Sequence, residues 1–372
     1  MKRLVLLGGG HAHIEVLRSL VSHLDSRLHV TLVSPRPWLT YTGMLPGHIA
    51  GHYALEECTV DLAALAYGAR ANLVRTSASL VSADAREVIC SDGTVIPYDV
   101  LSLDVGSRPL IGEARGAETH AFPVRPLERL VEGWNAVFTR AAKGQVTSIT
   151  LVGGGAAAIE LALAMNHRLR ATLESPTPKV RVISDGAGAG LAAGAMRRLA
   201  ARMRAAAVDF HVGSPVVEVG AEFVRLQSGI EFVTDAVFWA AGAAAHEWIA
   251  ESGLATDERG FLRTNDFLQS TSHGSVFGAG DCAGIQGQPR PKAGVFAVRA
   301  APVLYANLRA AIDGTPMRAF RPPRNYLALV TTGERHAVGM WDGISWQGRW
   351  AWRWKDRIDR RFVEKYRTPF GP

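Results

Sequence analysis

Apolar residues fall into short runs and helical repeats that alternate along the chain. Apolar runs at 4–7 and 28–34 enclose a segment, 14–24, whose apolar residues recur at helical spacing. The same order returns later, with strand-like runs at 147–152 and 179–184 and helical patterns at 159–170 and 192–206. A strand, a helix and a second strand form a βαβ unit. The pattern therefore predicts an α/β protein with two such units.

Each unit has glycines between its first strand and its helix. The first glycine turn, residues 8–13, reads GGGHAH, and the second, residues 153–158, reads GGGAAA. Glycines let the backbone approach a pyrophosphate, and the following helix offers unpaired N–H groups and the positive end of its dipole. We therefore expect two Rossmann-like dinucleotide-binding domains with one nucleotide each.

The chain from about residue 318 has a different composition, with Pro322-Pro323 and five tryptophans. Apolar residues recur every four positions at Trp350, Trp354, Ile358, Phe362 and Tyr366, which predicts one apolar stripe on a helix. Residues 349–367 include eight basic and three acidic side chains, a net of +5. A basic amphipathic helix with tryptophans is typical of a membrane interface. The alternative is that the stripe packs on the protein or on a second subunit.

Net charge, the length of apolar runs and the cysteine count limit the classes of protein to which this chain could belong. The formal charge of +7 suits an anionic partner, whether nucleotide, nucleic acid or lipid. No run approaches the roughly 20 consecutive apolar residues of a membrane helix, so we expect a cytoplasmic protein. Cys58, Cys90 and Cys282 are odd in number and far apart, which fits a reducing compartment and excludes a disulfide framework.

The order of these motifs resembles that of the flavoproteins with two dinucleotide-binding domains, the pyridine nucleotide-disulfide oxidoreductase superfamily. The resemblance covers nearly the whole chain. Residues 41–47 (YTGMLPG) and 291–294 (PKAG) resemble flavin-side loops of type II NADH dehydrogenases and sulfide:quinone oxidoreductases. The GGGHAH start and the segment 355–362 (KDRIDRRF) are most similar to the flavoprotein domain fused to some selenide, water dikinases.

The resemblance implies an FAD-binding domain at 1–115 and 255–317, an inserted NAD(P)H-binding domain at 116–254, and a membrane- or partner-contacting segment at 318–372. The residues that it implies for FAD are Gly8, Gly10, His11, Ala12, Ser34, Arg36, Thr42, Asp104, Gly106, Gly280, Asp281 and Ala293. Those that it implies for NAD(P)H are Gly153, Gly155, Ala156, Ala157, Ser184, Ala241 and Gly242.

Three positions depart from the family pattern. His13 stands where a third glycine is usual, so the first helix is expected to pack less closely on its strand. Ser34 and Ser184 stand where an acid usually binds the adenosine ribose, although Asp185 follows the second. No adjacent arginine indicates a 2′-phosphate, so the choice between NADH and NADPH stays open.

Two residues are candidates for chemistry beside the flavin. Glu160 matches the acid near nicotinamide and flavin in type II dehydrogenases, and its alternative is a solvated carboxylate at a helix start. Lys292 would stabilise negative charge on the flavin or acceptor, and its alternative is a surface lysine. The residues around His11 and His13 do not complete a tetrahedral set of metal ligands, so we expect a phosphate-facing or packing role and no metal.

Three functions are compatible with these residues. The resemblance implies a non-proton-pumping enzyme that passes electrons from NAD(P)H through FAD to a quinone, peripheral on the inner face of the cell membrane. A second function keeps both cofactors and reduces a soluble sulfur or selenium acceptor. A third is a flavin-bearing binding protein whose basic tail grips nucleic acid or a partner, but aromatics on a single stripe do not form a base-stacking platform, so no nucleic acid is expected. Whether the chain forms a homodimer stays open.

Overall fold

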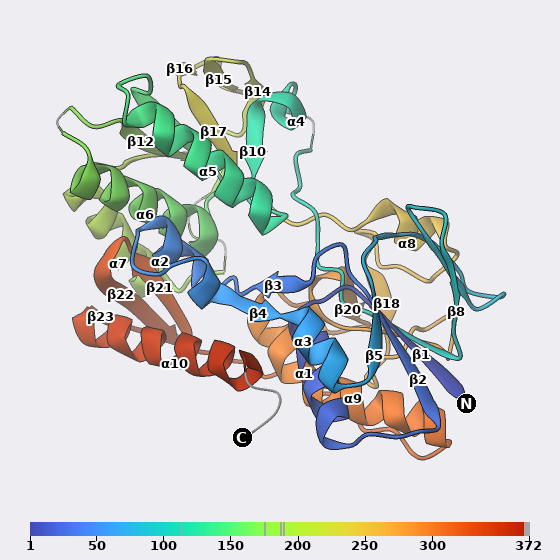
Figure 1. Cartoon of the computed structure of the whole chain (residues 1–372). Coiled ribbons are helices and arrows are strands. Elements are labelled where there is room, and N and C mark those ends of the chain that lie inside the picture. The colour runs from blue at the N-terminus through green and yellow to red at the C-terminus, as the bar shows by residue number, and fades with distance from the viewer. Residues whose placement is uncertain (113, 175, 187, 189, 368–372) are drawn as a thin grey trace.

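Two parallel sheets of five strands form the centre of the chain, one for each glycine turn (Figure 1). The structure is a computed structural model that describes residues 1–112, 114–174, 176–186, 188 and 190–367. The first sheet has the order β19 (Val276–Gly278), β9 (Val100–Leu103), β1 (Lys2–Leu7), β2 (Leu28–Val33) and β5 (Ala71–Val74). The second has the order β10 (Ala121–Pro123), β17 (Ala236–Trp239), β11 (Ser148–Val152), β12 (Lys179–Ser184) and β13 (Asp209–Val212). The predicted fold class, α/β with two Rossmann-like units, is confirmed.

The first unit places helices on one face of its sheet and an antiparallel sheet on the other. Successive strand residues point to opposite faces, so Leu4 and Leu6 pack toward the helices while Val5 and Leu7 pack toward the antiparallel strands. The helices are α1 (His11–Ser22), α3 (Leu62–Gly68) and α9 (Gly294–Asp313), and the antiparallel strands are β6 (Ala78–Ser82), β7 (Glu87–Cys90) and β8 (Val95–Pro97). The shorter elements are β3 (Trp38–Thr40), α2 (Leu45–Ile49), η1 (Glu56–Cys58), β4 (Thr59–Asp61), β18 (Leu262–Thr264), η2 (Gly280–Cys282) and β20 (Ala283–Ile285).

The apolar helix α9 belongs to this core. It is the one helix in the described part of the chain that is long and apolar enough to cross a membrane. However, α9 packs along α1 and buries Ala300, Ala301 and Leu304 against the first sheet. Its apolar character is therefore explained by its place in the fold.

The second unit repeats the plan of the first. Helices α5 (Leu127–Ala141), α6 (Ala156–Thr172) and α7 (Ala193–Ala205) cover one face, and α4 (Ala117–His120), β14 (Val216–Val219), β15 (Phe223–Leu226) and β16 (Glu231–Val233) lie on the other. The chain then returns to the first unit through α8 (Glu247–Glu251), which contacts β6. Ile249 and Leu254 pack in the core of the first unit, although the boundary expected from the sequence lies after them.

The C-terminal module, residues 328–367, joins the two units. It consists of the antiparallel strands β21 (Ala328–Thr332), β22 (Glu334–Trp341) and β23 (Ile344–Gly348), followed by α10 (Arg349–Arg367). In Figure 1 these red elements lie against α6 and α7, and α10 extends toward β4. The segment that the sequence marked as a distinct element is thus packed on both units.

The expectation of one apolar stripe on the C-terminal helix is wrong. Trp350, Trp354 and Ile358 are exposed to 54%, 41% and 39%, whereas Tyr366 is buried. A step of four residues turns an α-helix about 40° beyond a full circle, so the series drifts across the surface of the helix. The buried face follows a different set, Ala351, Lys355, Asp359, Val363 and Tyr366.

Candidate dinucleotide sites

The first glycine turn is built against the carboxyl end of β9. Leu7 pairs with Leu103, so Asp104 follows directly beside the turn. Gly8 has φ of +88°, a conformation that favours glycine, and a side chain there would collide with the Asp104 carbonyl. Gly10 is the N-cap of α1, and a side chain on it would displace the Asp104 carboxyl group. The glycines are thus required by close contact with Asp104 as well as by any ligand.

His13 fills the gap that the missing third glycine leaves. Its ring is fully buried, with Nδ1 2.6 Å from the Gly8 carbonyl oxygen and Nε2 2.8 Å from Ser102 Oγ. Burial lowers the pKa of His13 to about 4, so the ring is neutral near neutral pH. The helix is therefore joined to the sheet by a hydrogen-bonded side chain.

Two polar groups face the start of α1. The Asp104 carboxylate accepts the N–H groups of Ala12, at 2.7 Å, and of His13, at 3.2 Å. The His11 Nε2 atom is buried and, among the described residues, has no hydrogen-bond partner. Burial lowers the pKa of His11 to about 4. A neutral imidazole nitrogen without a partner at a helix start fits a diphosphate oxygen, so this turn fits FAD.

The predicted ribityl-binding residue, Asp281, lies in η2 and is paired. Arg125 donates from Nη1 to Asp281 Oδ2 at 2.8 Å and also bonds Ser107. Arg125 comes from the loop between β10 and α5, so the second unit supplies a cation to the predicted flavin site of the first. Sequence reasoning missed Arg125, because no motif marks it.

The residues expected near the adenosine are held by their neighbours. Ser34 is buried after β2 and donates its hydroxyl to the Arg36 carbonyl at 2.8 Å. Arg36 pairs with Glu128 of α5 at 3.3 Å and is about one-third exposed. The serine therefore shapes the turn, while the arginine links the two units beside the expected adenosine position.

The second glycine turn has the same geometry at the end of β17. Val152 pairs with Trp239, and a side chain on Gly153 would press on the Ala240 carbonyl group. Ala241 and Gly242 follow this contact. Gly155 is the N-cap of α6, and no side chain of the described residues caps the N–H groups of Ala156 or Ala157. The start of α6 therefore keeps free donors for a nucleotide diphosphate.

Ser184 lies at the end of β12, in the position expected for ribose recognition. Its hydroxyl is hydrogen-bonded to the Gly186 carbonyl, and Asp185 Oδ1 accepts the Gly186 N–H at 2.8 Å. Both side chains are thus part of a turn next to the second glycine turn. Residues 187 and 189 lie outside the described residues.

Glu160 meets the C-terminal module at Thr331 of β21. Its Oε1 accepts the Thr331 N–H at 2.6 Å and the Thr331 hydroxyl at 3.1 Å. Burial raises the pKa of Glu160, with nearby Lys355 acting in the opposite direction. Glu160 is therefore a held carboxyl group beside β21 and not a solvated end of α6.

Lys355 supplies the buried cation of this region. Its Nζ donates to Asp359 and to the Gly43 carbonyl, each at 2.6 Å. Tyr41 donates to Asp359 at 3.1 Å, and its ring stacks on Phe362 with centroids 4.3 Å apart. The loop 41–43 is thus attached to the inner face of α10. No sequence motif marks this pair, apart from the i, i+4 spacing of a Lys and an Asp.

Lys292, the cation predicted beside the flavin, lies in the first unit and lines the same cavity as Gly280 and Asp281. Its ammonium donates to the Ala283 carbonyl at 2.7 Å and lies 3.7 Å from the centre of the Phe261 ring. Burial lowers its pKa. Ala293, the next residue, is the N-cap of α9, and Thr42 Oγ1 lies 3.8 Å from where a Cβ on Gly294 would be. Thr42 thus lies beside Gly294 at the start of α9, while Lys292 turns toward Phe261.

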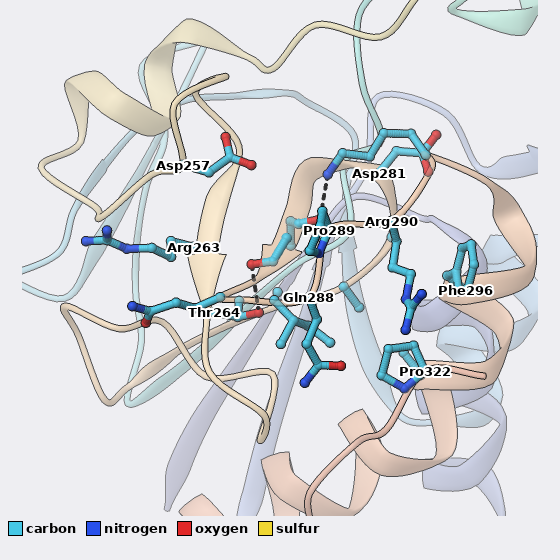
Figure 2. A pocket seen from close by; sticks show the side chains of 18 of the residues that line it. Asp257, Arg263, Thr264, Asp281, Gln288, Pro289, Arg290, Phe296 and Pro322 are labelled. Atoms are coloured by element: carbon cyan, nitrogen blue, oxygen red, sulfur yellow. Dashed lines mark hydrogen bonds between the residues drawn. The ribbon is translucent and has the colours of Figure 1, made fainter. Parts of the chain in front are cut away.

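A cavity of about 530 Å³ lies beside this region, between β18, β20 and α9 (Figure 2). Asp281 lies on its edge, and Arg290 and Phe296 point into it. Gly280, Lys292 and Ala293 also line it. The cavity is therefore continuous with the predicted flavin site.

The comparisons with known proteins agree with this geometry. The family model described as pyridine nucleotide-disulphide oxidoreductase matches residues 2–301. The chain is 25% identical to the alternative NAD(P)H-ubiquinone oxidoreductase C1 of Arabidopsis thaliana, over 91% of this chain and 72% of that protein. It is also 25% identical to an NADH dehydrogenase-like protein of Mycobacterium tuberculosis, over 76% of this chain and 73% of that protein.

Solved structures share the whole fold. NDH2 from Plasmodium falciparum in complex with NADH superposes with a TM-score of 0.83, at 14% identity, over 99% of this chain and 98% of that chain. The sulfide:quinone oxidoreductase from Aquifex aeolicus gives 0.82, at 20% identity, over 99% and 92%. The family model covers most of the sequence, and the two glycine turns have the geometry of dinucleotide sites. The chain therefore belongs to the pyridine nucleotide-disulphide oxidoreductase family and is an FAD-dependent oxidoreductase that uses a pyridine nucleotide.

Proposed function

We propose that this protein passes electrons from NAD(P)H through FAD to a quinone, without pumping protons. Relatives that span most of the chain are named as NADH dehydrogenases and as an NAD(P)H-ubiquinone oxidoreductase. Bound FAD would accept a hydride from the nicotinamide and pass the electrons on to the second substrate, the quinone. The protein's task is to position both substrates and to control charge and water around them.

The observation that carries the proposal is the meeting of three segments at Glu160, Gly43 and Lys355. Glu160 comes from the start of the nucleotide helix, Gly43 from the flavin-side loop, and Lys355 from the C-terminal helix. Burial raises the pKa of the Glu160 carboxyl group, which favours its protonated form, and the Lys355 ammonium group can stabilise negative charge nearby. A two-electron acceptor that also takes up protons, such as a quinone, suits this pair.

The cysteines favour a quinone over a thiol-dependent acceptor. All three are free and buried. Burial raises the pKa of Cys58 and of Cys282 to about 12, and also raises that of Cys90. A sulfur relay needs a thiolate, and none of these thiols ionises readily.

We assign one cofactor to each of the two units that contain a parallel sheet. FAD binds to the first unit, residues 1–115 and about 246–317, with the predicted contacts of the first glycine turn, Thr42, Asp104, Asp281 and Ala293. NAD(P)H belongs to the inserted unit, with the return to the first unit at about residue 246, because Ile249 packs in the first core. Glu160 and Lys292 keep their proposed roles, and Lys355 is added as a second cation beside Glu160.

The proposed membrane contact is made by the outer face of the C-terminal module. Trp350, Trp354 and Ile358 of α10 are exposed, as are Trp341 and Ile344 of the adjoining strands. Exposed arginines accompany them on α10, at 349, 353, 357 and 361. Aromatic and aliphatic side chains beside arginines suit the interface of an anionic membrane. The inner face of the same helix packs on the protein, so α10 would lie on the membrane surface.

The acceptor is tested by steady-state oxidation of NADH and NADPH with different second substrates. A short-chain quinone should support turnover, while polysulfide and selenite should support little. Turnover with polysulfide or selenite but none with quinone would replace the proposal by reduction of a soluble sulfur or selenium acceptor. A matched Glu160→Gln variant should lower quinone reduction at least about tenfold, the loss of one general acid.

A further inference from the structure

Asp104 caps the helix that should receive the FAD diphosphate. Its carboxyl group is buried between the first glycine turn and Gly280, where a side chain on either Gly10 or Gly280 would collide with it. It accepts the N–H groups of Ala12 and His13. The second glycine turn has no such carboxyl group, since Ala240 follows β17 and α6 carries no side-chain cap among the described residues.

The groups around Asp104 leave its charge without a cationic partner. Among the described residues it forms no ion pair, because Arg125 is bound to Asp281 and Lys292 to the Ala283 carbonyl. Asp281 adds a second negative charge nearby. The other titratable groups that face this place are the imidazoles of His11 and His13 and the thiol of Cys282, all neutral near pH 7.

Within the described part of the chain, an ionised Asp104 is therefore stabilised by two N–H groups and the helix dipole alone. Burial and Asp281 outweigh them, and the pKa of Asp104 is raised to about 7 in the protein without FAD. A diphosphate at the start of α1 would bring two further negative charges to the same helix end. Charges of one sign this close in a buried place disfavour the ionised carboxyl group further.

We propose that Asp104 holds a proton whenever FAD is bound, so that FAD binding above neutral pH takes up one proton from solvent and FAD release returns it. This inference rests on the proposed FAD site. Asp104 then contributes a neutral carboxyl group beside the diphosphate. The unprotonated oxygen of this side chain still accepts the N–H groups of Ala12 and His13.

The sign of the pH dependence follows from linkage. Below about pH 7, Asp104 is protonated with and without FAD, and the affinity for FAD does not change with pH. Above about pH 7, the free protein must take up a proton to bind FAD, so the dissociation constant rises by about tenfold for each pH unit. FAD has no titrating phosphate group in this range.

The experiment dilutes the purified holoenzyme at pH values from about 6 to about 8.5 and measures released FAD by its fluorescence, with circular dichroism to confirm that the protein stays folded. The dissociation constant should rise at least about tenfold between these limits. Asp104→Asn should bind FAD with a dissociation constant that does not vary, because the amide keeps the shape without the charge. His11→Gln should keep the wild-type slope.

A flat profile in the wild type, or an unchanged slope in Asp104→Asn, would overturn the proposal. If Asp104→Asn does not fold, the wild type still decides, since release of FAD in weakly buffered solution near pH 8 should release about one proton per flavin. No proton release would overturn the proposal. A protein that carries no flavin at any pH would instead overturn the proposed function.

Discussion

His13 joins α1 to two strands of the first sheet, through the Gly8 carbonyl group at the end of β1 and through Ser102 on β9. A glycine at this position has no side chain and would let α1 pack closer to the sheet. Here the ring itself occupies the space, and both nitrogens are hydrogen-bonded. The neutral form of His13 is therefore part of the folded structure.

His13 gives a pH-dependent contribution to stability. Burial lowers its pKa from 6.5 to about 4, so its contribution is fully present above about pH 6.5 and is lost as the pH falls toward 4. The loss amounts to about 3 kcal/mol. His13→Gln, which does not titrate, should be less stable than the wild type at neutral pH, and the difference should shrink by this amount at acidic pH. Urea unfolding at several pH values measures it, and a constant difference would show that His13 is not buried as described.

Asp281 should decide whether the protein keeps its flavin. Replacing Asp281 by Ala removes a carboxylate at the predicted ribityl position and leaves Arg125 without its ion-pair partner. We expect FAD affinity to fall by about 10- to 100-fold, the loss of one charge-assisted hydrogen bond. The exposed Asp266→Ala is the control, and flavin absorbance per protein measures the effect. Full FAD content in Asp281→Ala would mean that the site is misplaced.

Helix α10 combines two faces with different roles. Its inner face holds the flavin-side loop through Lys355 and Asp359, and its outer face exposes Trp350, Trp354 and Ile358. Removing the whole helix would expose the inner face, so point substitutions on the outer face separate lipid binding from folding.

The outer face is tested by the triple change Trp350→Ser, Trp354→Ser and Ile358→Ser. Binding to vesicles of anionic phospholipid should fall at least about tenfold, because three large side chains no longer enter the interface. Thermal unfolding should change little, since all three are exposed. The exposed Tyr67→Ser serves as a control with unchanged binding. Unchanged vesicle binding of the triple variant would contradict membrane contact by this surface and would favour contact with a protein partner.

The inner face is tested by Lys355→Met. This change leaves Asp359 buried without its cation, and we expect a loss of about 3 kcal/mol in the free energy of unfolding. Adding Asp359→Leu should recover part of that loss, because a buried pair replaced by apolar groups costs less than a broken pair. Arg353→Met, on the exposed side, should stay within about 0.5 kcal/mol of the wild type. Urea unfolding compares the four proteins, and a double variant less stable than Lys355→Met would contradict the pairing.

The molecule as a whole is two similar nucleotide units joined by the C-terminal module. Thr331 and Lys355 of the module meet Glu160 and Gly43, and Arg202 of α7 pairs with Glu334 of β22 at 2.8 Å. The loop 41–43 of the first unit and the start of α6 of the second unit therefore both pack against the C-terminal module.

Features of the fold that depend on residues close together in the chain could be predicted from the sequence. Strand and helix periodicity and the two glycine turns predicted both units, because a turn and its helix are set within about ten residues. Contacts between distant segments had no local signal. Asp281 and Arg125 are 156 residues apart, Glu160 and Thr331 are 171 apart, and Lys355 and Gly43 are 312 apart. The sequence motif marked Lys292, whereas Lys355 is brought to the loop 41–43 by tertiary packing and carries no motif.

The central claim is that electrons pass from NAD(P)H through FAD to a quinone. The most direct measurement is an anaerobic titration of the purified holoenzyme with NADH, followed by addition of a short-chain quinone, with flavin absorbance recorded throughout. We predict bleaching of the yellow flavin by NADH and recovery of the full absorbance with quinone. A flavin that NADH does not bleach, or that stays bleached in the presence of quinone, would contradict the account.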